Sequence, residues 1–422
     1  MGRKVNVNNI LINNIAVKGN RVECEIKVSK VLERYFNTNS MYIEYDFNIE
    51  SIPKSILTIP FVGSLIALAW LTDSVFWVDE IDKTFYDSIP TIRNAYQDIY
   101  RNASLKGRFA PSKIINYRLE RDPRLEAKSI MLFSGGADCH ASLIRNLDKH
   151  PMLCNIQGWY KDSKDNDVAA EADFRDIKLF ASQMNLMCSF VKSNFAVVVN
   201  EKHFNKTMKY VGDTWWHGFQ HSMAFISIAI PIAYSIGVDE IIIASSLTKG
   251  LNFLCASNVT TDSEFNFACD GHTLHDGFEL NRQDKMHVIV DFQKKLGRAY
   301  PIRVCSFNDH NCCECEKCLR TILGIVAEGG DIKDFGFYYE ESSVEHWQKV
   351  IYDKGGLMSF NSEQYIHWPH TRKRMDENYE NIIDKEFVDW FLNFDFDKAK
   401  KEGLRRYYRQ NFFSILKRKL HL

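Results

Sequence analysis

The chain has 422 residues, 45% of them hydrophobic, so it can bury the cores of two or three domains. Its formal net charge of −1 gives no overall field that would favour nucleic acid or acidic lipid. Five of its 11 cysteines form one cluster, and the other six are scattered, mostly within apolar runs, as in a reducing compartment; no apolar leader stands at the N-terminus. We therefore expect a cytoplasmic protein with no clear nucleic-acid partner.

Residues 1–122 predict an N-terminal α/β domain. Apolar and polar residues alternate over 22–28 and 41–45, which indicates strands with one solvated face. The run 56–71 is almost wholly apolar but shorter than the roughly 20 residues that cross a membrane. We expect a buried helix starting near Pro60 and no transmembrane segment. The domain is completed by a strand at 74–78, a helix near 89–100 and a basic linker at 106–124.

Residues 123–330 predict a second domain, because strand and helix patterns alternate along them. Such alternation favours an α/β fold with a doubly wound parallel sheet, in which ligands bind at the carboxyl ends of the strands. Residues 331–422 predict a helical, basic C-terminal region. The expected strands are 130–133, 152–157, 186–192 and 240–244, and the expected helices are 138–148, 169–184 and 217–236.

A glycine turn joins the first of these strands to its helix and predicts a phosphate-binding loop. Glycines let backbone N–H groups converge on an anion, and the helix N-terminus adds unsatisfied donors. The loop lacks the Lys-Ser/Thr pair of the nucleotide-binding P-loop. Its residues are Ser134, Gly135, Gly136, Ala137, Asp138 and Cys139. They resemble the SGGxD[ST] loop of the adenine-nucleotide α-hydrolase, or PP-loop ATP pyrophosphatase, families, with Cys139 at the usual Ser/Thr position.

Four cysteines far downstream are spaced as metal ligands. Cys312, Cys315 and Cys318 form CxxCxxC, and Cys305 precedes them. This spacing predicts a closed tetrahedral zinc site, in which the zinc is structural because no position is open for water. Reduced surface thiols and an iron–sulfur cluster are the alternatives. Cys313 is the spare cysteine, and His310 is a less favoured fourth ligand.

Together the loop and the cysteines resemble the 7-cyano-7-deazaguanine synthase branch of the ATP pyrophosphatases, over residues 128–326. The resemblance implies a HUP-like fold that splits ATP into AMP and pyrophosphate, with Mg²⁺ on the phosphates. It also implies a lysine at the start of the helix before the cysteines, here Lys285. Relatives with extra segments occur in antiphage and surface-polysaccharide gene clusters. Backbone at the end of the second strand reads adenine in that fold, which points to Asn155, Gln157 and Gly158.

Further candidates come from the charge pattern. Arg282 and Lys285 share one helical face, and a cationic pair there could stabilise charge on the α-phosphate or on departing pyrophosphate. An ordinary surface salt-bridge array is the alternative. We assign Asp138, Lys285 and Arg282 as catalytic and place Ser245 on the nucleotide-binding rim. His217 and His221 form HxxxH, a weak metal signal for which helix capping or a pocket role is favoured.

These patterns favour an enzyme that adenylates a carboxylate or amide oxygen of a small molecule. Ammonia or another nucleophile then displaces AMP, as in nitrile formation by the resembled branch. One alternative is a sulfur-transferring or base-modifying enzyme acting on tRNA. Another is a non-catalytic nucleotide-binding component of an antiphage or polysaccharide operon. The basic, aromatic tail at 398–422 suggests a protein partner or a membrane-surface helix, or simply a solvated helix.

Overall fold

The computed structural model describes residues 8–159, 164–250, 254–305, 308–340, 342–349 and 363–410. The chain forms two compact units. One comprises Met1–Ser134 and Arg145–Phe278, and the other comprises Gly135–Ile144 and Glu279–Leu422. These units differ from the predicted boundaries at 122 and 330, because the N-terminal strands and the downstream strands share one sheet.

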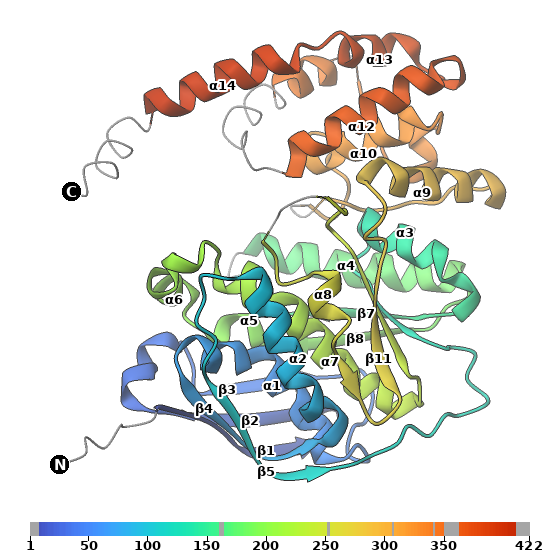
Figure 1. The fold of residues 1–422 in the computed structure, drawn as a ribbon. Coiled ribbons are helices and arrows are strands. Elements are labelled where there is room, and N and C mark those ends of the chain that lie inside the picture. The colour runs from blue at the N-terminus through green and yellow to red at the C-terminus, as the bar shows by residue number, and fades with distance from the viewer. Residues whose placement is uncertain are drawn as a thin grey trace. The chain divides into compact units, whose positions relative to one another are not determined.

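That sheet has eleven strands and lies wholly in the first unit (Figure 1). Its order is β10-β11-β9-β6-β7-β8-β3-β2-β1-β4-β5. The strands are β1 (Asn8–Lys18), β2 (Arg21–Val28), β3 (Ser40–Glu44), β4 (Ser74–Asp82), β5 (Arg108–Ile115), β6 (Ile130–Leu132), β7 (Met152–Gln157), β8 (Cys188–Ser193), β9 (Glu240–Ala244), β10 (Asn266–Phe267) and β11 (Gly271–Asp276).

The half of the sheet formed by β11, β9, β6, β7 and β8 is parallel throughout. From β6 the chain adds β7 and β8 on one side, then returns to add β9 and β11 on the other. This reversal is the topological switch of a doubly wound sheet, where ligands bind beyond the carboxyl ends of the strands. The predicted α/β class with a mostly parallel sheet is therefore confirmed.

The N-terminal strands extend this sheet because β3 pairs antiparallel with β8, with Ile43 opposite Ser193 and Glu44 opposite Lys192. The expected linker at 106–124 is wrong in part, since β5 occupies 108–115 and pairs with β4 at the sheet edge. Its side chains are mostly part-buried or exposed, and this weak apolar pattern gave no strand signal in the sequence.

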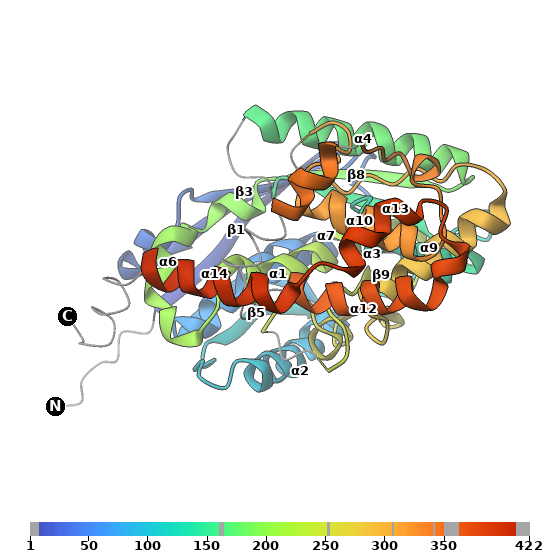
Figure 2. The ribbon, with the colours of Figure 1, turned by 90° about the horizontal axis from the view of Figure 1, so that it is seen from above.

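Two apolar helices, α1 (Lys54–Leu71) and α7 (His221–Ile236), pack against each other and against the sheet. They approach so closely that a Cβ on Gly63 would lie 1.9 Å from Ser227 Oγ. The helix α1 begins before the expected start at Pro60, because burial on every side holds this segment helical on both sides of the proline. The other helices are α2 (Lys83–Ile99), α4 (Lys164–Gln183), α5 (Phe195–Val198), α6 (Glu201–Thr207) and α8 (Val259–Asp262). The helix α4 packs on β7 and β8, and Figure 2 shows it beside β8.

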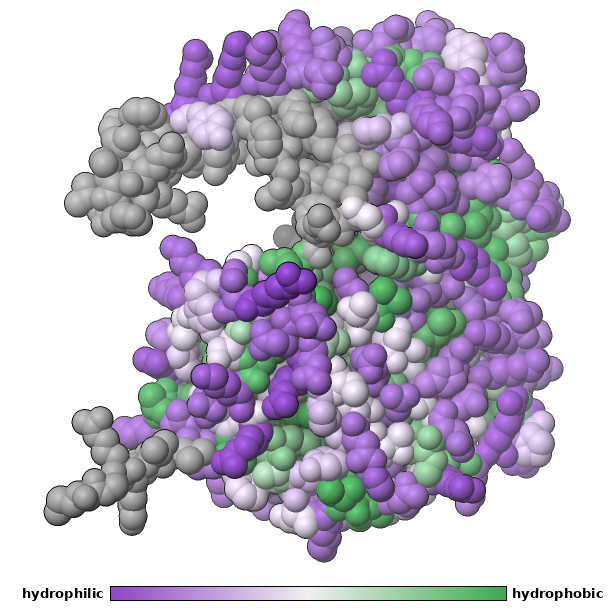
Figure 3. Space-filling view, viewed as in Figure 1, coloured by the Kyte–Doolittle hydropathy of each residue, from purple (hydrophilic) through white to green (hydrophobic). Residues whose placement is uncertain are grey.

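Two helical stretches among the described residues, Lys54–Leu71 and Trp216–Ile236, are long and apolar enough to cross a membrane. Both are mostly buried inside the protein, 89% and 72% of the respective windows, which fits the core of a soluble protein. On the face shown in Figure 3, hydrophilic side chains predominate and hydrophobic ones are scattered. The cytoplasmic location stays a prediction.

The second unit is helical. Its helices are α3 (Ala137–Arg145, to Ile144 in this unit), α9 (Arg282–Leu296), α10 (Glu316–Ala327), α12 (Glu363–Asn378), α13 (Lys385–Leu392) and α14 (Phe396–Gln410). The helices α9, α10 and α12 pack on one another. The predicted basic tail begins within α14, and its residues 411–422 lie outside the described part of the chain.

Candidate active site and metal centre

The predicted phosphate loop has the expected strand, turn and helix. The strand β6 ends at Leu132, and α3 begins at Ala137. Gly135 has a φ of +77°, a conformation that residues with a Cβ rarely adopt. A Cβ there would meet only Arg303 O, at 3.9 Å, so the backbone conformation rather than crowding requires glycine. The loop crosses from the first unit at Ser134 into the second at Gly135.

The second unit brings Asp138 together with both predicted cations. Lys285 Nζ lies 3.0 Å from Asp138 Oδ1, and Arg282 Nη1 lies 3.0 Å from Asp138 Oδ2. The Lys285 side chain is only 3% exposed and that of Arg282 10%, whereas Asp138 is 30% exposed. These residues therefore form a largely buried cationic pair facing a half-buried carboxylate, and not a surface salt-bridge array.

The three residues come from the first turns of two different helices. Asp138 lies in the first turn of α3, and Arg282 and Lys285 lie in the first turn or so of α9. The start of α9 is fixed by a capping box: the Asn281 side chain accepts hydrogen bonds from the backbone N–H groups of Gln283 and Asp284, and the Asp284 carboxylate accepts one from the Asn281 N–H. Cations at a helix N-terminus lie at the positive end of the helix dipole, so this arrangement favours anions nearby.

The first turns of α10 add two more cations to this cluster. Arg282 Nη2 lies 3.4 Å from Thr321 Oγ1, which donates to the Lys317 carbonyl. Arg320 pairs with Glu316 at 3.5 Å within the same helix. We call Asp138, Arg282, Lys285, Lys317 and Arg320 the cationic cluster. Within the described part of the chain, this group with Glu316 holds four cations and two carboxylates.

The electrostatics of the cluster follow from this excess of positive charge. Burial alone would raise the pKa of Asp138, but Lys285 and Arg282 outweigh it and hold that pKa well below its ordinary value. Burial, followed by the charge of Arg320, lowers the pKa of Lys317. Burial and the same cations lower the pKa of His367 to about 3, so this imidazole is neutral at physiological pH. A bound anion would relieve this repulsion.

Sequence reasoning identified Asp138, Arg282 and Lys285 but missed Lys317, Arg320, Thr321 and His367. A signal was present for two of them: Lys317 and Arg320 flank the metal-ligand candidate Cys318 and stand three apart on α10. No sequence signal places His367 near them, because it lies on α12 beyond a long intervening segment.

The residues predicted to read adenine all lie in the first unit, where their side chains already bind the protein itself. Asn155 is buried and donates from Nδ2 to the Phe133 carbonyl at 3.0 Å, which ties β7 to the end of β6. Gln157 donates to the Ala170 carbonyl at 2.9 Å. The Asn155 Oδ1 atom has no hydrogen-bond partner among the described residues.

Gly158 and Ser245 also have structural reasons for their presence. A Cβ on Gly158, whose φ is +107°, would lie 1.6 Å from Ser193 O, so β7 can approach β8 there only with glycine. Ser245 is fully buried, and its hydroxyl donates to the Leu247 carbonyl at 2.9 Å. Its backbone N–H donates to the backbone carbonyl of Asp276 at 2.8 Å, which ties the end of β9 to β11. Ser245 therefore shapes the strand end and does not present its hydroxyl to a ligand.

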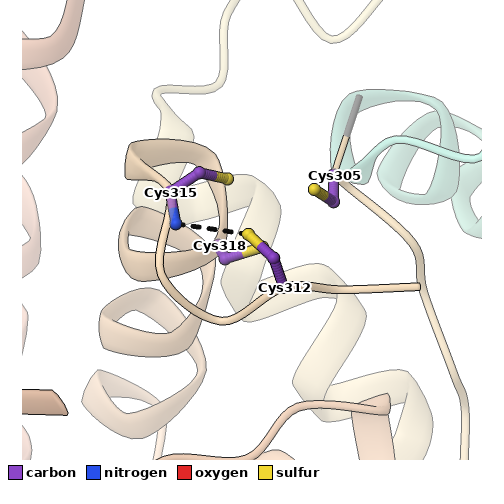
Figure 4. A group of neighbouring side chains, drawn as sticks. All are labelled: Cys305, Cys312, Cys315 and Cys318. Carbon is purple, nitrogen blue, oxygen red and sulfur yellow. Dashed lines mark hydrogen bonds between the residues drawn. The ribbon is translucent and has the colours of Figure 1, made fainter. Parts of the chain in front are cut away.

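The four predicted metal ligands converge in the second unit. The sulfurs of Cys305, Cys312, Cys315 and Cys318 all lie within 4.8 Å of one another (Figure 4). Cys312 Sγ and Cys318 Sγ are 3.9 Å apart, close to the about 3.8 Å separation that tetrahedral Zn–S bonds of about 2.3 Å require. The backbone N–H of Cys315 donates to Cys312 Sγ at 3.3 Å, as it would to a thiolate ligand. The residues present thus fit a metal ion such as zinc.

The two remaining candidate metal ligands, Cys313 and His310, have other hydrogen-bond partners. Cys313 has a φ of +56°, and its sulfur contacts the Tyr338 N–H and the Asn311 carbonyl rather than the other four sulfurs. The predicted alternative ligand His310 is exposed and bonds to Asp309. The side chain of Asn311 holds the loop, because it accepts from Val304 N–H and donates to the Ile302 carbonyl.

No family model matches the sequence, and no curated protein or solved structure is detectably similar to it. The resemblance to the ATP pyrophosphatases therefore rests on the loop, the four cysteines and the lysine at position 285 alone.

Proposed function

We propose that this protein is an ATP-dependent enzyme that adenylates a carboxylate or amide oxygen of a small molecule and releases pyrophosphate. The observation that carries the proposal is the cationic cluster at the loop, where three helices begin beside Asp138. Buried cations at helix N-termini match a polyanion better than a neutral ligand or a single carboxylate. The SGGxD motif adds the adenine-nucleotide assignment by resemblance alone.

In this proposal the substrate oxygen attacks the α-phosphorus while the bond to the bridging oxygen of pyrophosphate breaks. Negative charge then builds on the departing pyrophosphate. Lys285 and Arg282, which α9 holds beside Asp138, would stabilise this charge, because cations that are already fixed in place need little reorganisation. A nucleophile such as ammonia next attacks the activated carbon, and AMP leaves.

The metals have separate roles in this account. Zinc at the four cysteines would be structural, because four thiolates leave no open coordination position. Asp138 is the one carboxylate within the loop 134–139, and both its oxygens contact cations. Mg²⁺ would therefore be held chiefly by phosphate oxygens and water, as is common for this ion, and would supply neutralising charge to the triphosphate.

The test is pyrophosphate release from ATP in the presence of a panel of small carboxylic acids and amides, with AMP quantified in the same samples. Lys285→Ala should lower release by roughly 10²-fold or more, with a much smaller change in ATP affinity. Lys295→Ala is the matched control on the same helix, because that side chain is 73% exposed and pairs with Asp291. Formation of ADP and phosphate, or equal effects of the two variants, would contradict the proposal.

A further inference from the structure

A second group of reactive side chains lies entirely within the first unit, around Cys255. The backbone N–H of Ala256 donates to the His217 carbonyl at 2.9 Å, which fixes the cysteine beside the turn η4 (Trp216–Gln220). This turn is a π-helix, closed by a bond from the His221 N–H to the Trp216 carbonyl. Such turns are rare and occur frequently at functional sites.

The imidazole of His221, the first residue of α7, lies beside the Cys255 sulfur. His221 Nε2 lies 4.0 Å from Sγ, while its Nδ1 lies 3.0 Å from the Trp216 carbonyl. A carbonyl only accepts, so Nδ1 carries the proton and the Nε2 lone pair faces the thiol. His217 contributes to lowering the pKa of Cys255, and its Nδ1 lies 2.9 and 3.0 Å from the two oxygens of Asp213.

Asp213 is itself held rigidly. The Tyr100 hydroxyl donates to Oδ2 at 2.8 Å, and the Thr214 N–H donates to Oδ1 at 2.7 Å. A Cβ on Gly218 would lie 3.0 Å from the carboxylate, so the turn closes tightly over it. A nucleophile, a base within reach and a third group that orients the base form the arrangement used in covalent catalysis.

The charges around the sulfur favour its ionised form. Burial alone would raise the pKa of Cys255, but His217 and His221 outweigh it and lower that pKa to about 7. Asp213, with help from Cys255, raises the pKa of His217 to about 10. Tyr96 on α2 and Tyr100, which follows the end of α2, also face this group, and burial keeps both neutral by raising the pKa of each. Burial alone would lower the pKa of His221, but its hydrogen bond with Cys255 outweighs burial and raises that pKa, with a smaller contribution from Asp262 on α8.

A metal site does not account for this group. Among the described residues, the four cysteines of the second unit are the set whose ligand atoms converge closely enough to hold an ion. Cys255 also differs from two other cysteines of the same unit, the buried Cys24 and the part-buried Cys188. Burial raises the pKa of Cys24 to about 12, and burial with Asp46 raises that of Cys188.

We propose that Cys255 is the nucleophile of a second site, which takes up an acyl group from an activated carboxylic acid derivative as a thioester. The thiolate attacks the carbonyl carbon, the bond to the leaving group breaks, and protonated His217 gives its proton to that group. Water or an amine then attacks the thioester, returns a proton to His217 and regenerates the thiolate. Asp213 is a positioning residue. This proposal goes beyond ATP-dependent adenylation and does not depend on it.

The experiment uses the full chain and p-nitrophenyl acetate as the acyl donor, with the acetylated peptide identified by mass spectrometry. Wild type should release a burst of p-nitrophenol and carry one acetyl group on Cys255. Cys255→Ala should lose both, and His217→Gln should slow acetylation by roughly 10²-fold. Cys188→Ser is the matched control and should react like wild type.

A second measurement does not depend on reagent access. The ultraviolet absorbance of thiolate, taken as wild type minus Cys255→Ala over a pH series, should show ionisation near neutral pH. Asp213→Asn should move its midpoint to higher pH, because a less basic His217 stabilises the thiolate less. Acetylation of other cysteines while Cys255 stays unmodified, ionisation of Cys255 only at alkaline pH, or loss of a bound metal ion in Cys255→Ala would overturn the proposal.

Discussion

The pairing of one carboxylate with two buried cations makes Asp138→Asn the most informative single substitution. The amide keeps the size of the side chain but removes the charge that faces Lys285 and Arg282, whose side chains are 3% and 10% exposed. Removing one partner of a buried ion pair costs about 3–5 kcal/mol, because the remaining charge stays buried without compensation. We expect the lower end of that range, since Asp138 is 30% exposed to water.

Urea unfolding of the full chain measures this loss, and it is large against a total stability of about 5–15 kcal/mol. Asp291→Asn is the matched control, because its partner Lys295 is mostly exposed and the pair should contribute little. Inorganic pyrophosphate should restore stability to the Asp138 variant, by about 2.7 kcal/mol at 100 times its dissociation constant. Equal unfolding free energies for wild type and Asp138→Asn would refute the reasoning.

The ion pairs of Asp138 with Lys285 and Arg282 also predict that the free energy of unfolding depends on pH. The folded-state pKa of Asp138 is lowered, so its contribution is fully present above the unfolded value of about 3.9. It is lost as the pH falls from there towards the folded-state pKa. The stability difference between wild type and Asp138→Asn should therefore be constant near neutral pH and shrink below about pH 4. A difference that grows in acid would contradict the assignment.

Three further predictions concern the metal site and the loops. The purified chain should hold about one zinc ion, and chelation should lower its melting temperature, because structural zinc binding is folding free energy. By metal analysis, Cys315→Ser should lose the zinc while Cys313→Ser retains it, and iron with acid-labile sulfide would instead indicate a cluster. Gly158→Ala should destabilise the protein more than Gly250→Ala. Gly250 has a φ of +92° and no atom within 4 Å of an added Cβ, so its substitution should cost only the backbone strain of about 1–3 kcal/mol. Equal melting temperatures of the two variants would refute the close approach of Gly158 to Ser193.

Local signals predicted four of the five strands in the parallel half of the sheet and missed β11. The strands β7 and β9 fall where short apolar runs end in polar residues, and the cysteine spacing anticipated the four convergent sulfurs. The buried helix α1 was also expected, although its first turns precede Pro60. These features depend on residues close together in sequence, so hydrophobic periodicity and the spacing of the cysteines predict them.

Long-range pairings were beyond such reasoning. Nothing local indicates that β3 pairs with β8, and this pairing merges two expected domains into one sheet. The HxxxH motif gave a weak signal, but Cys255 approaches it only because the chain returns after α7 and β9. Asn155 and Ser245 stand at strand ends as expected, yet their hydrogen bonds to backbone carbonyls follow from packing that the sequence pattern does not specify.

Calorimetric titration of the full chain with inorganic pyrophosphate, followed by Mg·ATP, tests the central claim most directly. The cationic cluster should bind one pyrophosphate per chain, ATP should compete for the same site, and Lys285→Glu should abolish binding because it reverses a buried charge. Lys295→Glu, which changes an exposed residue of the same helix, should bind like wild type. The absence of pyrophosphate and ATP binding by the wild-type protein would contradict the account.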